Sequence, residues 1–514
     1  MPHISHWAKV APDRTATLMA ASGEAVTYGE LDAASNRVAH LLRSRGLRTG
    51  DGIVIVMENH SRFLEICWGA QRSGLYFTPA SWRLKPDELT YILENSGAAA
   101  LFVTPRFADV AREAADRAAL RHRHRFIVGG NVPGFESYAT AVAGLPRTPI
   151  ADEALGRDML YSSGTTGLPK GIKNALSDAA ITSIPPVMAF LTKLYGFDEQ
   201  TINLTPAPLY HAGPLRYSMC IGHTGGMNVI MESFAPELAL ELIQRHRITH
   251  AEMVPTMFVR WLKLPESVRR NVDLSSLKMV IHGTGPCAPE TKRAMIEWLG
   301  PILHEQYGGT EGNGLCVIDS NEWLSRPGSV GKAVVGQLRV LDSNGRELPA
   351  GEDGLIYFEG GPKFEYHGDP EKTRTAYSSA GWSTLSDVGH VDDEGYLFLT
   401  DRLSHMIISG GVNIYPQEIE NVLIAHPSVF DVAVFGVPDE EFGESVMAVV
   451  HPVNMTHAGP ELARELVEYC RRRMSTIKCP RAIDFSQDLP RHETGKIYKR
   501  LLKEKYVQAT RSPG

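Results

Sequence analysis

The feature that most constrains the fold of this 514-residue chain is a regular alternation of short apolar runs and longer amphipathic stretches. GIVIVM (52–57) is followed by SRFLEICWGAQRSG (61–74), and AALFVT (99–104) is followed by RFADVAREAADRAALRH (106–122). Strand-length runs that alternate with stretches of helical period are typical of α/β proteins with largely parallel sheets. Three further runs continue the pattern: THAEMVP (249–255), LKMVIHG (277–283) and PILHEQYG (301–308).

The pattern changes after residue 333, where strand-like runs follow one another at short intervals. VVGQLRVLDSNGRELPAGEDGLIYFEG (334–360) and DEGYLFLTD (393–401) contain Asn-Gly and Glu-Gly pairs, which favour tight turns between strands. Beyond them, a final segment combines two helical patterns with several strand-like runs. We therefore predict an α/β protein with a large N-terminal domain (1–401), built of parallel-sheet subdomains plus a small β-barrel-like subdomain, and a small α+β C-terminal domain (402–514).

Composition limits the classes of partner. The formal charge of −7 comes from acids and bases interspersed along the chain, so no nucleic-acid-binding face is predicted. Six cysteines show neither the close pairing of a metal site nor the density of a disulfide scaffold. No apolar run approaches the roughly 18 residues of a membrane span, and residues 1–20 lack the pattern of a signal peptide. We predict a cytoplasmic protein, without a membrane span, that binds small molecules.

The loop YSSGTTGLPKG (161–171) concentrates glycines, hydroxyl side chains and a lysine. Backbone N–H groups of such a loop converge on an anion, and Ser and Thr hydroxyls add donors, so a triphosphate is the natural ligand. It is not a Walker A loop, because Gly164, Gly167 and Lys170 are each three residues apart. Taken alone, the stretch also fits a surface loop of turn residues.

Further stretches follow the loop in a definite order, and together they cover nearly the whole chain. With the loop, they resemble the adenylate-forming superfamily of acyl- and aryl-CoA synthetases, peptide-synthetase adenylation domains and firefly luciferases, and most closely its acyl-CoA synthetases. The stretches are PLYHAGP (208–214), EQYGGTEG (305–312), STLSDVGHVDDEGYLFLTDR (383–402), IISGGVNIYPQEIE (407–420) and LPRHETGKIYKR (489–500).

The resemblance implies a two-step ligation. A carboxylate attacks the α-phosphate of ATP to give an acyl-adenylate and pyrophosphate, and the thiol of coenzyme A then displaces AMP. ATP, Mg²⁺ and coenzyme A would be required, because positive charge must gather where the two anions meet. The implied ATP- or AMP-binding residues are Ser162, Ser163, Gly164, Thr165, Thr166 and Lys170 in the loop, and Thr284, Gly285, Gln306, Tyr307, Gly308, Asp387 and Arg402 elsewhere.

The resemblance also implies the reacting groups. Lys496 would contact the substrate carboxylate and the α-phosphate as the catalytic lysine. His211 would gate the acid, Thr310 would reach the α-phosphate, and Glu311 would hold Mg²⁺ through hard carboxylate oxygens.

The second half-reaction is implied to follow a rotation of a mobile C-terminal domain about a hinge at Ser404. Gly410 and Gly411 would then let the pantetheine arm pass, and Phe442 would stack on the adenine of coenzyme A.

Two stretches depart from the family pattern. STLSDVG has serine where many relatives have glycine before the aspartate, and Asp401-Arg402-Leu403-Ser404-His405 lacks the usual charged pivot residue.

Several alternatives stay open. The strand-like run before Gly283-x-Gly285-x-x-Ala288 also fits a weak dinucleotide-binding fingerprint, so an NAD-dependent oxidoreductase is the alternative from another class. A free-standing adenylation enzyme that loads a carrier protein and a non-catalytic binding protein are the others. Small residues flanked by apolar ones around the expected pocket suggest a fatty acid or another bulky apolar acid. A homodimer is compatible with all of these.

Overall fold

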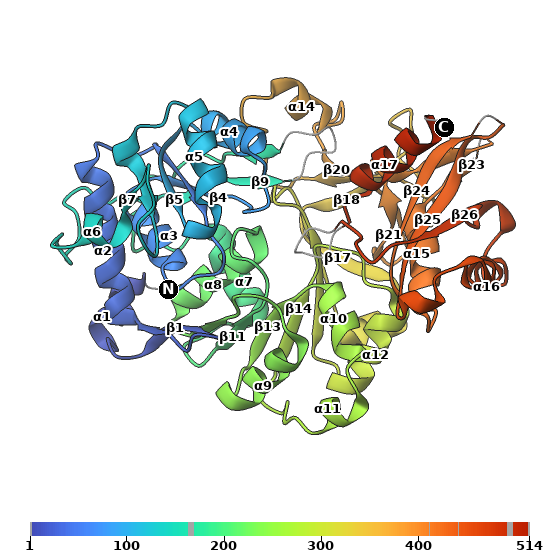
Figure 1. The fold of residues 1–514 in the computed structure, drawn as a ribbon, viewed down its shortest axis with the longest axis horizontal. Coiled ribbons are helices and arrows are strands. Elements are labelled where there is room, and N and C mark those ends of the chain that lie inside the picture. Colours follow the sequence, from blue (N-terminus) through green and yellow to red (C-terminus); the bar gives the residue numbers. More distant parts are fainter. Residues whose placement is uncertain (1–2, 163–168, 411, 440, 491–496, 512–514) are drawn as a thin grey trace. The chain divides into compact units, whose positions relative to one another are not determined.

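The computed structural model describes residues 3–162, 169–410, 412–439, 441–490 and 497–511 (Figure 1). The chain divides into two compact units. Unit 1 comprises Met1–Met253, Leu264–Val280 and Phe364–Arg374, and unit 2 comprises Val254–Lys263, Ile281–Lys363 and Thr375–Gly514. Each unit is described by itself below.

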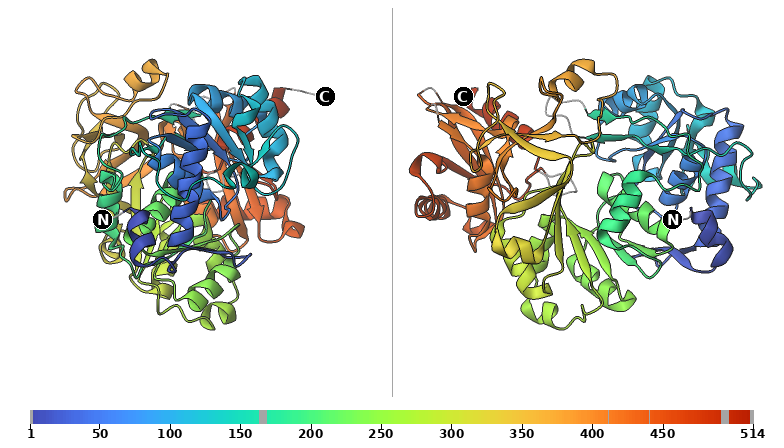
Figure 2. Two further views of the ribbon diagram at one scale, coloured as in Figure 1. Left: turned by 90° about the vertical axis from the view of Figure 1, so that its left-hand side faces the viewer. Right: turned by 180° about the vertical axis from the view of Figure 1, so that it is seen from behind.

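Unit 1 contains a six-stranded sheet with the strand order β7, β6, β5, β3, β4, β8, in which every pairing is parallel. Helices connect the central strands and lie on both faces of the sheet (Figures 1 and 2). The strands are β3 (Gly52–Val56), β4 (Tyr76–Pro79), β5 (Ala98–Val103), β6 (Arg125–Ile127), β7 (Glu136–Ser137) and β8 (Arg157–Asp158). The helices are α2 (Tyr28–Ser44), α3 (Phe63–Arg72), α4 (Pro86–Asn95), α5 (Ala108–Arg117) and α6 (Tyr138–Val142).

The burial of β3 explains why helices cover both faces of this sheet, because successive side chains of a strand point to opposite faces. Val54 and Val56 of β3 belong to the core cluster that also contains Leu89 of α4 and Ala111 of α5. The whole of β3 is buried, as expected for a parallel strand between two helical layers. The apolar run GIVIVM is therefore a central strand, as predicted.

A second sheet in unit 1 has the order β2, β1, β12, β11, β13, followed by β14. β11 pairs in parallel with β12 and β13, and β1 pairs in parallel with β12. Helix α8 packs against β11, β12 and β13. The strands are β1 (Thr15–Met19), β2 (Ala25–Thr27), β11 (Ile202–Thr205), β12 (Met227–Ile230), β13 (His250–Met253) and β14 (Met279–His282, whose first half belongs to unit 1). The remaining elements of unit 1 are α1 (Ile4–Val10), the hairpin β9 (Leu160–Ser162) and β10 (Lys170–Ile172), α7 (Pro186–Tyr195), α8 (Ala212–Thr224), α9 (Pro236–His246), α11 (Glu266–Arg270) and most of α14 (Pro370–Thr375).

Unit 2 begins with helices α10 (Pro255–Leu262) and α12 (Pro289–Leu299) and continues into antiparallel strands. Their order is β18, β19, β20, β21, β17, β16, β15. Only Gly336 separates β17 from β18, so these two strands meet although three others lie between them in the sheet, and the group must curl towards a barrel. The elements are β15 (Leu303–Gly308), β16 (Leu315–Asp319), α13 (Ser320–Ser325), β17 (Ser329–Val335), β18 (Gln337–Leu341), β19 (Gly354–Glu359), β20 (Ser383–Val391) and β21 (Leu397–Arg402).

The last part of unit 2 is an α+β layer structure, coloured orange to red in Figure 2. The alternating residues Val432 and Val434 of β24 pack with α15 and α16, whereas Ala433 and Phe435 pack with α17 on the opposite face. The elements are β22 (Ile407–Ser409), β23 (Val412–Ile414), α15 (Pro416–Ile424), β24 (Val429–Asp439), β25 (Gly443–Pro452), α16 (Pro460–Arg471), β26 (Ala482–Phe485) and α17 (Lys499–Arg511).

These observations confirm the predicted α/β class, its parallel sheets, its antiparallel barrel-like part and its final α+β segment. The predicted turns at Asn344-Gly345 and Glu394-Gly395 fall between β18 and β19 and between β20 and β21. Among the described helices, none has the length and apolarity needed to cross a bilayer. All six cysteines are free thiols.

Candidate active site

A buried carboxylate in unit 2, Asp387, joins three strands at one point. The Tyr307 hydroxyl on β15 donates to Asp387 Oδ2 at 2.7 Å, and Arg402 Nε on β21 lies 3.0 Å from Asp387 Oδ1. Asp387 and Arg402 are register partners of β20 and β21, so the sheet itself sets their separation. Phe358 stacks on the Tyr307 ring with centroids 6.3 Å apart. A carboxylate held in this way has acceptor positions left for hydroxyl groups of a ligand.

The charges of this group are fixed by its surroundings. Burial, and then the Asp387 carboxylate, raise the pKa of Tyr307 well above its usual value, so its hydroxyl remains a donor. Burial acts to lower the pKa of Arg402, but Asp387, Tyr307 and Glu311 together outweigh it and raise that pKa. Glu311 therefore belongs to the same electrostatic group as Tyr307, Asp387 and Arg402.

Asp387 is presented by an irregularity in β20. The register between β19 and β20 shifts between the pairs Leu355–Val388 and Tyr357–Thr384, and Ser386 has a positive φ of 64°. The Ser386 N–H donates to Thr384 Oγ1 at 2.9 Å, which stabilises the turn of the chain. A left-handed serine costs on the order of 1 kcal/mol relative to glycine. In the stretch STLSDVG, which departs from the family pattern, a strained Ser386 therefore stands directly before the buried carboxylate of Asp387.

The predicted Thr284 and Gly285 follow β14 and come directly after Gly283, which lies beside Gln306. A Cβ at Gly283 would be 2.5 Å from the Gln306 carbonyl oxygen, so only glycine lets this segment approach β15 so closely. Thr284 has a φ of 71°, which is unusual for a β-branched residue and is found preferentially at ligand sites. The structure therefore brings Gly283, directly before Thr284 and Gly285, against Gln306, the residue before Tyr307.

Gly308, Thr310 and Glu311 complete this end of β15. A Cβ on Gly309 would be 2.6 Å from Glu311 Oε2, so the carboxylate folds back over the glycine pair. The described residues contain no group of three or more His, Cys, Asp or Glu side chains that could hold a metal ion. One carboxylate suits Mg²⁺, because this ion commonly completes its coordination shell with substrate phosphates and water. The donor chemistry at Glu311 fits that ion.

In unit 1, Ser162 and Lys170 face each other as register partners of β9 and β10, at the base of the predicted phosphate loop. The Lys170 ammonium lies 4.8 Å from the centre of the Tyr366 ring. His211 is the residue before α8, and its ring centre lies 4.1 Å from that of Tyr210, which meets Trp82 edge to face at 4.9 Å. The predicted gate residue therefore lies against Tyr210, which in turn contacts Trp82.

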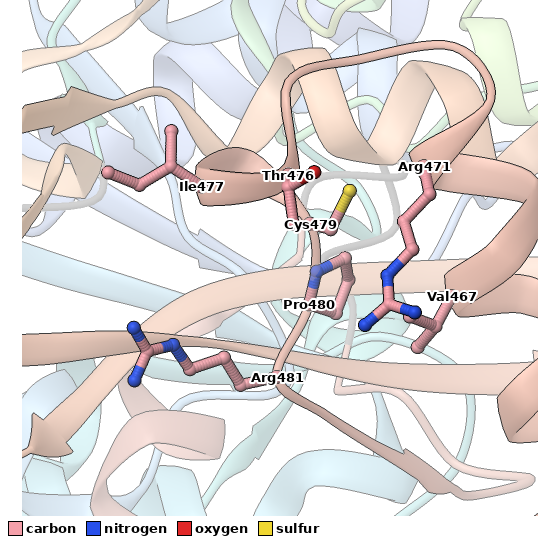
Figure 3. Close-up of a pocket in the computed structure, with 7 residues that line it drawn as sticks. All are labelled: Val467, Arg471, Thr476, Ile477, Cys479, Pro480 and Arg481. Carbon is pink, nitrogen blue, oxygen red and sulfur yellow. The ribbon is translucent and has the colours of Figure 1, made fainter.

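The predicted coenzyme A residues Gly410 and Phe442 are brought together in unit 2. The Gly410 N–H donates to the Phe442 carbonyl at 2.8 Å, and the Arg481 guanidinium lies 3.8 Å from the centre of the Phe442 ring. Arg481 also lines a pocket of about 490 Å³ whose other residues are shown in Figure 3. They are Val467, Arg471, Thr476, Ile477, Cys479 and Pro480. An aromatic ring and cationic side chains suit an anionic nucleotide.

The predicted hinge residue Ser404 lies in a 3₁₀ turn, Leu403–His405, directly after β21. His405 Nδ1 lies 3.4 Å from Asp401 Oδ1, and the Gln417 N–H donates to Asp401 Oδ2 at 2.9 Å. The turn thus has a polar contact where the family has a charged pivot. Six predicted residues lie outside the described part of the chain: Ser163, Gly164, Thr165, Thr166, Gly411 and Lys496.

Comparison with known proteins assigns this arrangement. Residues 4–363 match the family described as AMP-binding enzyme, and residues 418–496 match the AMP-binding enzyme C-terminal domain. The chain belongs to the AMP-binding enzyme family.

Relatives of this AMP-binding enzyme cover almost its whole length. Feruloyl-CoA synthase of an Amycolatopsis species is 34% identical over 491 residues, which are 94% of each chain. The fatty acid–[acyl-carrier-protein] ligase ScoC of Streptomyces coeruleorubidus is 31% identical over 496 residues, 94% of this chain and 92% of the relative. The crystal structure of ATP-bound MatB from Rhodopseudomonas palustris has a TM-score of 0.81 at 28% identity and covers 99% of each chain.

Family membership confirms the predicted resemblance, the ligase class, in which AMP is formed and an acid is joined to a thiol, and ATP and Mg²⁺ as cofactors, and coenzyme A fits as the co-substrate. Membership of this family excludes the alternative of an NAD-dependent oxidoreductase. The roles of the individual residues remain predictions.

Sequence reasoning did not identify two buried groups, one in each unit. Lys292 of α12, fully buried, donates to Glu305 Oε2 at 2.6 Å and so ties α12 to β15 one residue before Gln306. Glu252 of β13 is 7% exposed, and its Oε2 has no hydrogen-bond partner among the described residues. The sequence feature that could have predicted this buried carboxyl is the single Glu in the apolar run THAEMVP.

Proposed function

We propose that this AMP-binding enzyme activates a carboxylic acid as its acyl-adenylate and transfers the acyl group to coenzyme A, releasing AMP and pyrophosphate. The observation that carries the proposal is the Tyr307–Asp387–Arg402 group, a buried carboxylate braced by a neutral donor and a cation. Such a carboxylate can accept hydrogen bonds from both ribose hydroxyls of ATP without moving.

The other nucleotide roles follow from position. Adenine would lie against the Tyr307 ring, with Thr284, Gly285, Gln306 and Gly308 forming the walls of its site. Ser162 to Lys170 would enclose the β- and γ-phosphates, and Thr310 would contact the α-phosphate. Mg²⁺ held at Glu311 would supply positive charge beside the phosphates when bound.

Charge explains the proposed role of Lys496. The carboxylate oxygen attacks the α-phosphorus while the bond from that phosphorus to the pyrophosphate oxygen breaks, so two anions must be held together. An ammonium on a long side chain can contact both at once, and His211 would orient the acid.

We further propose that the domain boundary lies at 401/402 and that rotation about Ser404 exchanges Lys496 for the Gly410–Gly411 segment before thiol attack.

The acceptor thiol is the main open choice between two candidates. Coenzyme A is supported by the feruloyl-CoA relative and by the cationic and aromatic surroundings of Phe442 and Arg481. The carrier-protein alternative is supported by the 31% identity to ScoC. The six free cysteines suit a reducing compartment such as the cytoplasm.

Pyrophosphate release tests the proposal. Purified enzyme, ATP and Mg²⁺ are incubated with a panel of fatty, aromatic and hydroxylated acids, with coenzyme A, with a carrier protein, or with neither. We expect acid-dependent pyrophosphate and AMP, and a coenzyme A thioester whose yield equals the AMP formed. Acid-independent ATP turnover, or a product found only on the carrier protein, would contradict the coenzyme A proposal.

A further inference from the structure

Glu252 stands out among the buried acidic side chains described in unit 1, because Glu65 and Asp158 each pair with an arginine. Its side chain lies near the end of β13, and its Oε2 has no hydrogen-bond partner among the described residues. Burial raises its pKa to about 8, so it is mostly a neutral carboxylic acid at pH 7. A neutral carboxyl offers one O–H donor and one carbonyl acceptor.

The amide side chains buried between α8 and the sheet have hydrogen-bond partners. Asn203 donates to Thr205 Oγ1 and to Asn228 Oδ1, and Asn228 donates to the Ser218 carbonyl. An unsatisfied buried polar group costs on the order of 1–3 kcal/mol. Since these amides are paired, the Glu252 Oε2 atom indicates a partner that the described residues do not provide.

Helix α8 is shaped around this carboxyl. Glu252 Oε1 packs against Gly213 in the first turn of α8, where a Cβ would overlap it. Gly213 has no positive φ, so alanine would otherwise be favoured in the helix by about 1 kcal/mol. Glycine at 213 is therefore explained by the approach of the Glu252 side chain, two residues after His211.

The topology places this pair where α/β sheets bind ligands. β11 and β13 are adjacent parallel strands, and the chain leaves β11 towards β12 but leaves β13 towards β14, in the opposite direction. The carboxyl ends of strands at such a divergence open into a crevice that binds ligands. Glu252 lies at the carboxyl end of β13, and α8 begins beyond the carboxyl end of β11.

We propose that Glu252 is a specificity-determining residue that hydrogen-bonds a hydroxyl group on the acyl part of the substrate. This inference rests on the proposed function, because it takes the acid to lie beside His211. The preferred acids would then be hydroxylated, rather than the wholly apolar acids that the small residues around the pocket suggested. A site built to pair with a hydroxyl discriminates against an analogue that leaves the protein group unpaired.

Matched acids test the proposal. The kcat/KM for pyrophosphate release is measured with cinnamic acids that carry a hydroxyl at each ring position in turn, and with the methyl analogue at the same position. A second pair is 12-hydroxydodecanoic acid and tridecanoic acid. We expect at least one hydroxylated acid to exceed its methyl partner by about 10- to 100-fold in the parent enzyme.

Variants show whether Glu252 is responsible. Glu252→Leu should reduce that ratio to about threefold or less and raise the melting temperature, because it removes an unpaired buried carboxyl. Glu252→Gln, which keeps a donor and an acceptor, should retain most of the preference. Glu65→Leu is the matched control: Glu65 is also buried in unit 1 but accepts from Tyr138 at 2.5 Å and pairs with Arg62, so its loss should lower the melting temperature and leave the ratio unchanged.

The outcomes separate this inference from the proposed function. An enzyme that adenylates none of the acids contradicts the proposed function. An enzyme that adenylates them with no hydroxyl preference, or whose preference survives Glu252→Leu, overturns only the role of Glu252. A Glu252→Leu protein destabilised as much as Glu65→Leu would assign Glu252 a structural role.

Discussion

Asp387→Asn is the substitution that probes the proposed ribose site most sharply. It keeps the shape of the side chain but removes its charge, and it leaves one acceptor oxygen where Tyr307, Arg402 and two ribose hydroxyls need two. Hydrogen bonds to a charged group contribute about 1.5–3 kcal/mol each, so losing the charge and one acceptor should cost ATP about 2–4 kcal/mol. That corresponds to a rise of roughly 30- to 1,000-fold in the KM for ATP.

The cost to folding should be smaller. Asp387 is 7% exposed, but the Arg402 side chain is 37% exposed and can be solvated when its partner is neutralised. We expect a loss of about 1–2 kcal/mol in the free energy of unfolding, below that of a fully buried pair.

Steady-state kinetics against ATP concentration, calorimetric titration with Mg²⁺-ATP and thermal melting measure these quantities. Asp353→Asn is the matched control, because Asp353 accepts from His390 and Thr400 in the same unit but is about one-third exposed. Its KM for ATP should be unchanged. A folded Asp387→Asn enzyme whose ATP affinity stays within threefold of the parent would refute the ribose-site reasoning.

Three further predictions concern other groups. Because the folded-state pKa of Glu252 is raised to about 8, its proton is retained in the native state but lost on unfolding between about pH 5 and pH 8, so stability falls as pH rises through this window by at most about 1.4 kcal/mol per pH unit. The melting temperature of Glu252→Gln relative to the parent should therefore increase from pH 5 to pH 8. The neighbouring Tyr195 and Tyr217 do not interfere, because they titrate at higher pH. A constant difference in melting temperature would show that Glu252 does not titrate in this window. Ser386→Gly should match or exceed the parent in stability by up to about 1 kcal/mol, whereas Ser386→Val should lose more than that, and equal melting temperatures would contradict the left-handed backbone at 386. Lys496→Ala should lower adenylation by about 10²–10³-fold but leave thioester formation from a supplied acyl-adenylate much less affected, and equal loss in both half-reactions would remove Lys496 from the first step.

The sequence was informative where local pattern decides the structure. The alternation of GIVIVM with an amphipathic stretch is sufficient for β3 and α3, because a buried parallel strand and an amphipathic helix each have a characteristic period. The turns at Gly345 and Gly395 were predictable because only glycine adopts their positive φ readily. Motifs likewise identified Tyr307, Asp387 and Arg402, which the structure brings into contact.

The remaining features depend on contacts between distant residues. Glu252 looked like one acid in an apolar run, and only the packing of α8 on β13 shows that its Oε2 has no hydrogen-bond partner in the described part of the chain. The stack of Phe358 on Tyr307 joins β19 to β15, which no local period specifies. The sequence showed that Ser386 departs from the family pattern, but its left-handed backbone follows from the shifted register of β20.

The path of one oxygen atom tests the central claim most directly. An acid that the enzyme accepts is prepared with ¹⁸O in both carboxylate positions and converted with ATP and coenzyme A, and the AMP is analysed by mass spectrometry. If the carboxylate attacks the α-phosphate and the thiol then displaces AMP, each AMP molecule carries one ¹⁸O and the thioester retains the other. Label in inorganic phosphate with ADP as the nucleotide product, or AMP without label, would contradict an acyl-adenylate.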